Sequence, residues 1–289
     1  GSQIAMFQPL LLMIYTLAAM VTACEDGPLK PVYPETVTDS TYADRTYITS
    51  VPMLRDGKKY PLVFVFHGAG GNGAGIRSFS GFDKSTWSDS CIFVYPDAKV
   101  ENWDEGCRCN KPYRLGIDDV GFIDAIYKTM IDKYPVNTRR VYAVGFSQGG
   151  LFAHYVACRL SHRFAAVASV ASSMNQPLST YGAPEEKTSV FIIHGKNDGV
   201  LPYQGSNEGS FSLLSAPQTL TWWGNYYKMQ RTAIGEKAGK NTTLDRYGLE
   251  SGHEIRLLTP EEEGHQWFFN DFNTTETVLS FFKTKSRTP

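Results

Sequence analysis

Apolar runs and helical patterns alternate along most of the chain. Continuous apolar runs over residues 62–66, 91–95 and 190–193 are typical of strands buried on both faces of a parallel sheet. Between the second and third runs, residues 120–131 place apolar side chains on one face of a helix. Strands that alternate with helices in this way predict an α/β fold with a mostly parallel central sheet.

Further elements are predicted on either side of these runs. Residues 46–51 alternate like a strand, and Asp56 and Gly57 predict a hairpin turn after it. Two more strands and two helices are predicted over residues 164–170, 254–258, 212–229 and 274–285. Residues 172–189 are too few for a large lid, so we expect a shallow, open cleft.

The sequence Gly145-Phe-Ser-Gln-Gly149 follows a strand over residues 141–144 and precedes a helix that begins with small residues. In this context a Gly-x-Ser-x-Gly sequence predicts a nucleophile elbow, a sharp turn that lifts the serine out of the sheet edge. Ser147 is therefore the candidate nucleophile. The alternative is a chance match, with Ser147 as an ordinary helix N-cap, but the strand before it and the helix after it favour the elbow.

A serine nucleophile needs a base and an acid at the same edge of the sheet. Asp198 follows the strand over residues 190–193 and is the candidate acid. His265 follows the last predicted strand and is the candidate base, which completes the chain order serine, aspartate, histidine. His194 is predicted to pack at the end of its strand, and His253 lies on the wrong side of the last strand.

The glycine-rich loop over residues 67–71 ends a buried strand and lets backbone N–H groups approach a ligand closely. We expect the N–H groups of Ala69 and Gln148 to form an oxyanion hole, which stabilises negative charge on a reacting carbonyl oxygen. The alternatives are a plain tight turn or a phosphate-binding loop. No Lys-Ser or Lys-Thr pair follows the glycines, which disfavours phosphate binding.

Residues 1–24 are predicted to be an export signal behind a short cloning remnant, because the apolar run over residues 10–21 ends in small residues before Cys24. This end of the run also resembles a bacterial lipobox, in which Cys24 would carry a lipid and attach the protein to a membrane. The alternative is a buried apolar helix. Residues 25–45 are predicted to be a tether and residues 46–289 a single catalytic domain. The expected location is outside the cell, as a secreted protein or an outer-surface lipoprotein.

Charge and cysteine content limit the classes of partner. The 28 basic and 29 acidic residues nearly balance, which disfavours nucleic-acid binding. No metal or organic cofactor is expected, because no cluster has ligand spacing. Outside the predicted signal, Cys91, Cys107, Cys109 and Cys158 allow three full pairings. The sequence does not choose among them, although Cys107 and Cys109 are too close for an unstrained bridge to each other, and Cys158 is as readily a buried free thiol as a bridge partner.

The motifs now described resemble a family of secreted α/β-hydrolases. It includes feruloyl esterases of carbohydrate esterase family 1, acetylxylan esterases and polyhydroxybutyrate-depolymerase-like proteins. The resemblance covers residues 47–282. It rests on His67-Gly-Ala-Gly-Gly-Asn72, Trp103 with Cys107 and Cys109, Asp118-Asp-Val-Gly-Phe122, Gly145-Phe-Ser-Gln-Gly-Gly150, His194-Gly-Lys-Asn-Asp198 and Gly264-His-Gln-Trp267.

This resemblance implies an α/β-hydrolase fold, a triad of Ser147, Asp198 and His265, and an ester substrate attached to a polymer. Trp267 would lie beside the cleft, and Trp103 is an aromatic candidate for stacking on a feruloyl ring or a sugar. Feruloylated xylan is the first candidate substrate, acetylated xylan the second and a polyhydroxyalkanoate the third. An alternative of another class is a non-catalytic binding protein with the same fold. The oligomeric state stays open.

Overall fold

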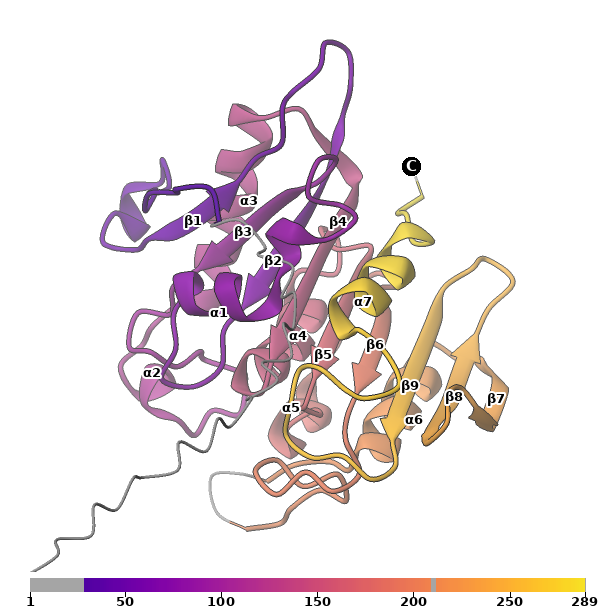
Figure 1. Cartoon of the computed structure of the whole chain (residues 1–289). Helices are drawn as coiled ribbons and strands as arrows, with labels where there is room; N and C mark the ends of the chain where they lie inside the picture. Colours follow the sequence, from indigo (N-terminus) through magenta and orange to yellow (C-terminus); the bar gives the residue numbers. More distant parts are fainter. Residues whose placement is uncertain (1–28, 209–211, 289) are drawn as a thin grey trace, which may run out of the picture. The chain divides into compact units, whose positions relative to one another are not determined.

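The computed structural model describes residues 29–208 and 212–288. The strands of this part of the chain form one sheet in the order β1-β3-β2-β4-β5-β6-β9-β8-β7, which can be followed in Figure 1. The strands are β1 (Tyr47–Ser50), β2 (Tyr60–Phe66), β3 (Ile92–Pro96), β4 (Val136–Phe146), β5 (Ala166–Val170), β6 (Ser189–Ile193), β7 (Gln230–Lys237), β8 (Thr242–Gly248) and β9 (Glu254–Pro260). The α-helices are α1 (Gly73–Ser80), α2 (Lys111–Arg114), α3 (Asp119–Lys133), α4 (Gln148–Arg159), α5 (Gln176–Tyr181), α6 (Ala216–Tyr226) and α7 (Thr274–Lys283).

The central strands from β3 across to β9 are parallel, and β1, β8 and β7 add antiparallel pairs at the two edges. The predicted α/β fold with a mostly parallel sheet is therefore confirmed. In a parallel sheet the carboxyl ends of the strands meet at one edge. The loops after β2, β4, β6 and β9, which carry the candidate site residues, consequently start from the same edge.

Helices cover both faces of the sheet, and β2 shows why its sequence is apolar throughout. Successive side chains of a strand point to opposite faces. Phe64 and Phe66 join a core that includes residues of α3, α4 and α6. Val63 and Val65 join a second core that includes residues of α1 and α7, and Figure 1 shows these two helices on the same side of the sheet. All seven residues of β2 are buried.

The predicted hairpin at Asp56 and Gly57 is wrong. The turn exists, with Gly57 at a φ of 73°, but the two strands that it connects do not pair with each other. β1 pairs with β3, and β2 lies on the other side of β3. Because β2 is apolar on both faces, it takes a central position in the sheet, and β1 is left at an edge.

The strands β7 and β8 have no counterpart among the sequence predictions. They form an antiparallel extension of β9 at the end of the sheet. All but one of the residues of β7 are exposed. A strand with two polar faces carries neither an apolar run nor an alternating pattern, so hydrophobic patterning misses it.

The chain before β1 divides into a part outside the described residues and a part that contacts the domain. The predicted export signal over residues 1–24, with Cys24, lies outside the described residues. Within the predicted tether, Glu35 forms a β-bridge with Tyr47, Val37 is buried, and Arg45 is buried in an ion pair. Residues from Glu35 onward therefore pack against the domain. No helix within the described ranges has the length and apolar character of a membrane span.

Cys107 and Cys109 form a disulfide, although their spacing in the sequence disfavours one. Arg108 between them has a φ of 55°, in the left-handed region. This conformation folds the backbone back on itself and leaves the two cysteine Cα atoms 5.2 Å apart, within the range that a disulfide spans. Cys91 and Cys158 are buried free thiols.

Candidate active site

Ser147 lies on a strained turn between β4 and α4. Its φ of 56° and ψ of −120° are unusual for a residue with a side chain. A carbon added to Gly145 would approach the Gly149 carbonyl oxygen to 1.9 Å, and one added to Gly149 would approach the Phe66 carbonyl oxygen to 2.4 Å. Only glycine fits at either position, which is the geometry that an elbow motif requires.

His265 bridges Ser147 and Asp198. Its Nε2 lies 3.0 Å from the Ser147 Oγ, and its Nδ1 lies 2.7 Å from the Asp198 Oδ2. A carboxylate only accepts hydrogen bonds, so Nδ1 carries the ring proton and Nε2 is left to accept one from the serine. The structure thus brings together the three side chains that the sequence proposes as nucleophile, base and acid.

Asp198 is buried, and both of its carboxylate oxygens have partners. Oδ1 accepts hydrogen bonds of 2.8 Å from the backbone N–H groups of Val200 and Leu201. Oδ2 faces His265 and, at 3.3 Å, the Nε2 of His194. Burial alone raises the pKa of this carboxyl, but the hydrogen bonds from the two histidines and the two amides outweigh burial and hold the pKa well below its usual range. Asp198 is therefore charged at neutral pH.

His194 is fully buried at the end of β6 and stays on that strand end as predicted. Its Nε2 lies 2.8 Å from the Leu201 carbonyl oxygen, so Nε2 carries the proton. The same N–H group points toward Asp198, which gives His194 a supporting role that the sequence did not indicate. Of the two histidines that face Asp198, His265 is the one that bridges the aspartate to the serine.

The glycine-rich loop after β2 passes beside Ser147. A carbon added to Gly68 would lie 3.5 Å from the Ser147 Cβ. His67 fixes this loop, because its Nε2 accepts a hydrogen bond of 3.0 Å from the Ala98 backbone N–H and its Nδ1 lies 2.7 Å from the Gly68 carbonyl oxygen. His67 thereby holds the loop close to the serine, which is a structural role.

The two predicted oxyanion donors lie on segments next to the nucleophile. Ala69 follows Gly68 in the glycine-rich loop and is exposed to solvent. Gln148 is the first residue of α4, where backbone N–H groups have no acceptor within the helix. The positions of Ala69 and Gln148 are consistent with the oxyanion hole, whose role remains a prediction.

The Gln148 side chain connects α4 to the long loop between β3 and α3. Its Oε1 accepts a hydrogen bond of 2.9 Å from the Trp103 backbone N–H. Its Nε2 donates to the Trp103 carbonyl oxygen at 2.6 Å and to the Glu105 carboxyl at 3.0 Å. Glu105 is buried, and this burial raises its pKa to about 7. No motif in the sequence pointed to Glu105.

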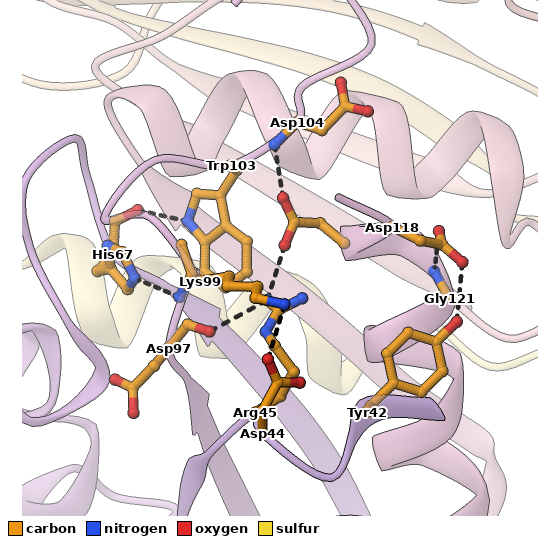
Figure 2. A network of polar contacts seen from close by, with 12 residues as sticks. Tyr42, Asp44, Arg45, His67, Asp97, Lys99, Trp103, Asp104, Asp118 and Gly121 are labelled. Atoms are coloured by element: carbon orange, nitrogen blue, oxygen red, sulfur yellow. Dashed lines mark hydrogen bonds and ion pairs between the residues drawn. The ribbon is translucent and has the colours of Figure 1, made fainter. Parts of the chain in front are cut away.

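Figure 2 shows how the same loop is anchored on its other side. The Trp103 indole N–H donates to the His67 carbonyl oxygen at 3.0 Å. The Asp104 backbone N–H donates to one carboxylate oxygen of Asp119 at 2.7 Å, and the other oxygen pairs with the buried guanidinium of Arg45 at 2.7 Å. The loop that carries Trp103 is therefore fixed to both segments that flank the serine.

Neither Trp103 nor Trp267 reaches the surface. Both indole side chains are 0% exposed. Trp103 stacks on Phe152 with ring centroids 4.6 Å apart, and the Trp267 indole N–H donates to the Thr275 hydroxyl at 2.9 Å. The prediction that these tryptophans contact a substrate is therefore wrong, because burying such large apolar rings in the core is strongly favourable.

Other aromatic side chains lie at the site instead, with Phe79 and Phe268 exposed and Phe146 partly buried. The Phe146 ring, next to Ser147 in the chain, lies 5.3 Å from the His265 ring and 5.4 Å from the Phe79 ring. Phe79 in turn lies 6.4 Å from Phe268. An isolated phenylalanine has no sequence signal that would place it at an active site. These three residues could be found only from their ring contacts in the structure. Within the described residues, no group of three or more His, Cys, Asp or Glu side chains is placed to hold a metal ion.

The sheet order, the elbow and the three converging loops are those of the α/β-hydrolase fold. Comparison with known proteins agrees. A family model described as Phospholipase/Carboxylesterase matches residues 121–221. Among solved structures, an acetyl xylan esterase from Aspergillus awamori has a TM-score of 0.63, with 15% identity over 88% of this chain and 100% of that one. A ferulic acid esterase from Anaeromyces mucronatus has a TM-score of 0.58, with 17% identity over 90% of this chain and 92% of that one.

Relatives found by sequence carry the names of feruloyl esterases. A probable feruloyl esterase C of Aspergillus clavatus is 32% identical over 168 residues, which are 56% of this chain and 57% of the relative. A feruloyl esterase D of Neurospora crassa is 27% identical over 209 residues, 66% of this chain and 68% of the relative. The chain thus spans less than two thirds of the length of the Aspergillus clavatus protein. The chain therefore has the α/β-hydrolase fold and is similar in sequence to feruloyl esterases.

Proposed function

We propose that the chain is a serine carboxylic-ester hydrolase in which Ser147 is the nucleophile, His265 the base and Asp198 the acid. The observation that carries this proposal is the hydrogen-bonded series from Asp198 through His265 to Ser147, with the serine held on a strained turn. A strained backbone has a cost, and it clusters at sites where a side chain must be presented for chemistry.

The proposed reaction begins when the Ser147 Oγ attacks the ester carbonyl carbon while Nε2 of His265 accepts the hydroxyl proton. The carbonyl oxygen becomes negative, and the N–H groups of Ala69 and Gln148 stabilise it. The charged Asp198 stabilises the imidazolium that forms. His265 then gives its proton to the alcohol oxygen as the carbon–oxygen bond breaks, which leaves the acyl group on Ser147.

Water completes the cycle by the same steps. His265 takes a proton from a water molecule as the water oxygen attacks the acyl carbon. The bond between this carbon and the Ser147 Oγ breaks, the free acid leaves, and His265 returns the proton to the serine. No step requires a group outside this chain except the ester and water.

The proposed substrate is a feruloyl or related hydroxycinnamoyl ester on plant cell-wall polysaccharide. The names of the Aspergillus and Neurospora relatives support this choice. Acetylated xylan is the second candidate, because a bifunctional acetylxylan esterase/xylanase of Neocallimastix patriciarum is 28% identical over 216 residues, 71% of this chain and 28% of that protein. A polymeric substrate lies outside the cell, which fits the export signal proposed for residues 1–24.

The first test is labelling by a serine-directed fluorophosphonate combined with an ester assay. We expect one label per chain, lost in Ser147→Ala, and release of ferulate from methyl ferulate. Labelling of the Ser147→Ala variant at wild-type stoichiometry would move the nucleophile elsewhere. Neither labelling nor hydrolysis, together with retention of feruloylated xylan by the folded protein, would instead indicate the non-catalytic binding protein.

A further inference from the structure

Two exposed phenylalanine rings lie beside the proposed catalytic residues. Phe79, on α1, is 48% exposed, and Phe268, in the loop after β9, is 44% exposed. Their ring centroids are 6.4 Å apart, and the rings meet edge to face. No other phenylalanine in the described ranges is exposed to this degree. Single exposed apolar side chains are common on proteins, but a contiguous apolar patch indicates a binding surface.

Phe146 connects this pair to the proposed nucleophile. It directly precedes Ser147, its ring lies 5.4 Å from the Phe79 ring, and the same ring lies 5.3 Å from the His265 ring. His265 in turn lies 3.0 Å from the Ser147 Oγ. The three phenylalanines therefore form a continuous apolar surface that begins at the serine and its base, here called the aromatic shelf.

The shelf is held in place by buried groups and loop contacts. The buried Trp267 packs edge to face against Phe146 at 6.1 Å. The loop that carries Phe268 is closed by Gln266, whose amide donates to the Phe268 carbonyl oxygen at 2.7 Å and to the Glu263 carboxyl at 3.1 Å. Side chains that are fixed before binding lose little freedom when a ligand arrives, so they contribute more to affinity.

We propose that Phe79, Phe146 and Phe268 bind the aromatic ring of the substrate's acyl group, and that this contact selects hydroxycinnamoyl esters over acetyl esters. The inference rests on the proposed function and names the residues that give that site its substrate preference.

The reach of the acyl group fits the shelf. The reacting carbonyl carbon must lie roughly 3 to 3.5 Å from the serine oxygen. In a hydroxycinnamoyl ester two carbons separate this carbonyl from the ring, so the ring centre lies roughly 5 Å farther on, from standard bond lengths. The shelf begins at Phe146, beside the serine, and continues outward through Phe79 and Phe268. An acetyl group ends at its methyl carbon, so it has no ring to place against Phe79 and Phe268.

The test compares methyl ferulate with methyl acetate, which share the same leaving alcohol. We expect Phe79→Ala and Phe268→Ala each to lower kcat/KM for methyl ferulate about tenfold, as the loss of one buried aromatic contact implies. The same variants should change kcat/KM for methyl acetate less than about twofold. Phe268→Tyr keeps the ring and should keep the preference. Ile234→Ala, on the exposed strand β7, is the control for removal of an exposed apolar side chain and should alter neither ester.

The outcomes separate the shelf from the underlying function. If wild-type protein hydrolyses both esters and the phenylalanine variants lower both equally or neither, the shelf is wrong while the proposed hydrolase stands. If the variants instead lower hydrolysis of phenyl acetate and leave methyl ferulate unchanged, the shelf holds the alcohol group, which also overturns the acyl assignment. If wild-type protein hydrolyses no ester and is not labelled at Ser147, the proposed function itself has failed.

Discussion

Two loops contribute to the surroundings of Ser147, and each contains a tryptophan that the sequence proposes as a substrate contact. The loop between β3 and α3 carries Trp103, and the loop after β9 carries Trp267. Both indoles are 0% exposed, so the two loops do not differ in how deeply their tryptophans are buried. They differ in what each tryptophan supports.

The Trp103 loop is turned inward. Its contacts run to the His67 carbonyl oxygen and the Gln148 side chain, which belong to the two segments proposed to hold the oxyanion. The Trp267 loop is turned outward, since it presents His265 to Ser147 and Phe268 to solvent. The same residue type thus supports the proposed oxyanion hole in one loop, and the proposed base and aromatic shelf in the other.

Removing the proposed base, which lies in the loop after β9, should have the largest effect on catalysis. We expect His265→Ala to lower kcat for methyl ferulate by at least about three orders of magnitude, because His265 Nε2 is the group that lies 3.0 Å from the Ser147 Oγ and can accept its proton. The matched control is His253→Ala, because the Nδ1 of this histidine lies 2.8 Å from the Ser251 hydroxyl rather than beside the proposed nucleophile. Turnover of His265→Ala within tenfold of wild type would mean that the outward loop does not supply the base.

The residues of the proposed triad could be predicted because each follows a recognisable strand in a fixed order. An apolar run, its end and the next polar residue place Ser147, Asp198 and His265 at one sheet edge before any coordinates are known. The predicted fold class is confirmed for the same reason, since buried parallel strands have a strong apolar signal.

Burial within loops could not be predicted in this way. A tryptophan in an irregular segment has the same sequence signature whether it packs inward or lines a cleft. The sequence therefore predicts substrate contacts for Trp103 and Trp267, which the structure buries. Phe79 and Phe268 meet through the tertiary fold alone. Glu105 lies in no pattern, and its importance appears only when the Gln148 amide is seen to donate to it.

Replacing each tryptophan by phenylalanine should sharpen the difference between the two loops. Each variant loses a hydrogen bond donated by an indole N–H group. Trp103 donates to the His67 carbonyl oxygen, and Trp267 donates to the Thr275 hydroxyl. We expect each to lose roughly 1 to 3 kcal/mol of unfolding free energy in urea titrations. Trp103→Phe should lower kcat for methyl ferulate and methyl acetate alike, whereas Trp267→Phe should lower the ferulate-to-acetate ratio of kcat/KM. The same pattern of kinetics in both variants would contradict the division of roles.

Glu105 should make the inward loop sensitive to pH. Burial raises the pKa of this carboxyl from 4.5 to about 7, so the folded state favours the neutral form. Stability from this group is therefore fully present below the unfolded pKa and is lost as the pH rises from about 4.5 to about 7, by up to about 3 kcal/mol.

Glu105→Gln keeps an acceptor for the Gln148 amide and cannot ionise. The variant should be more stable than wild type at pH 8 by up to about 3 kcal/mol and indistinguishable at pH 4, as measured by urea unfolding at both pH values. Equal stability differences at the two pH values would show that Glu105 titrates normally.

The disulfide of the inward loop should have the smallest effect. Cys107 and Cys109 close a ring of only three residues, and the chain-entropy stabilisation from so short a loop is about 1.5 kcal/mol. We expect Cys107→Ser/Cys109→Ser to lose no more than about that amount in urea unfolding and to keep its ferulate-to-acetate ratio, because Trp103 and the Gln148 side chain still hold the loop through hydrogen bonds. A changed ratio in this double variant would show that the inward loop also shapes substrate selection, and the assignment of selection to the outward loop and its phenylalanines would no longer hold.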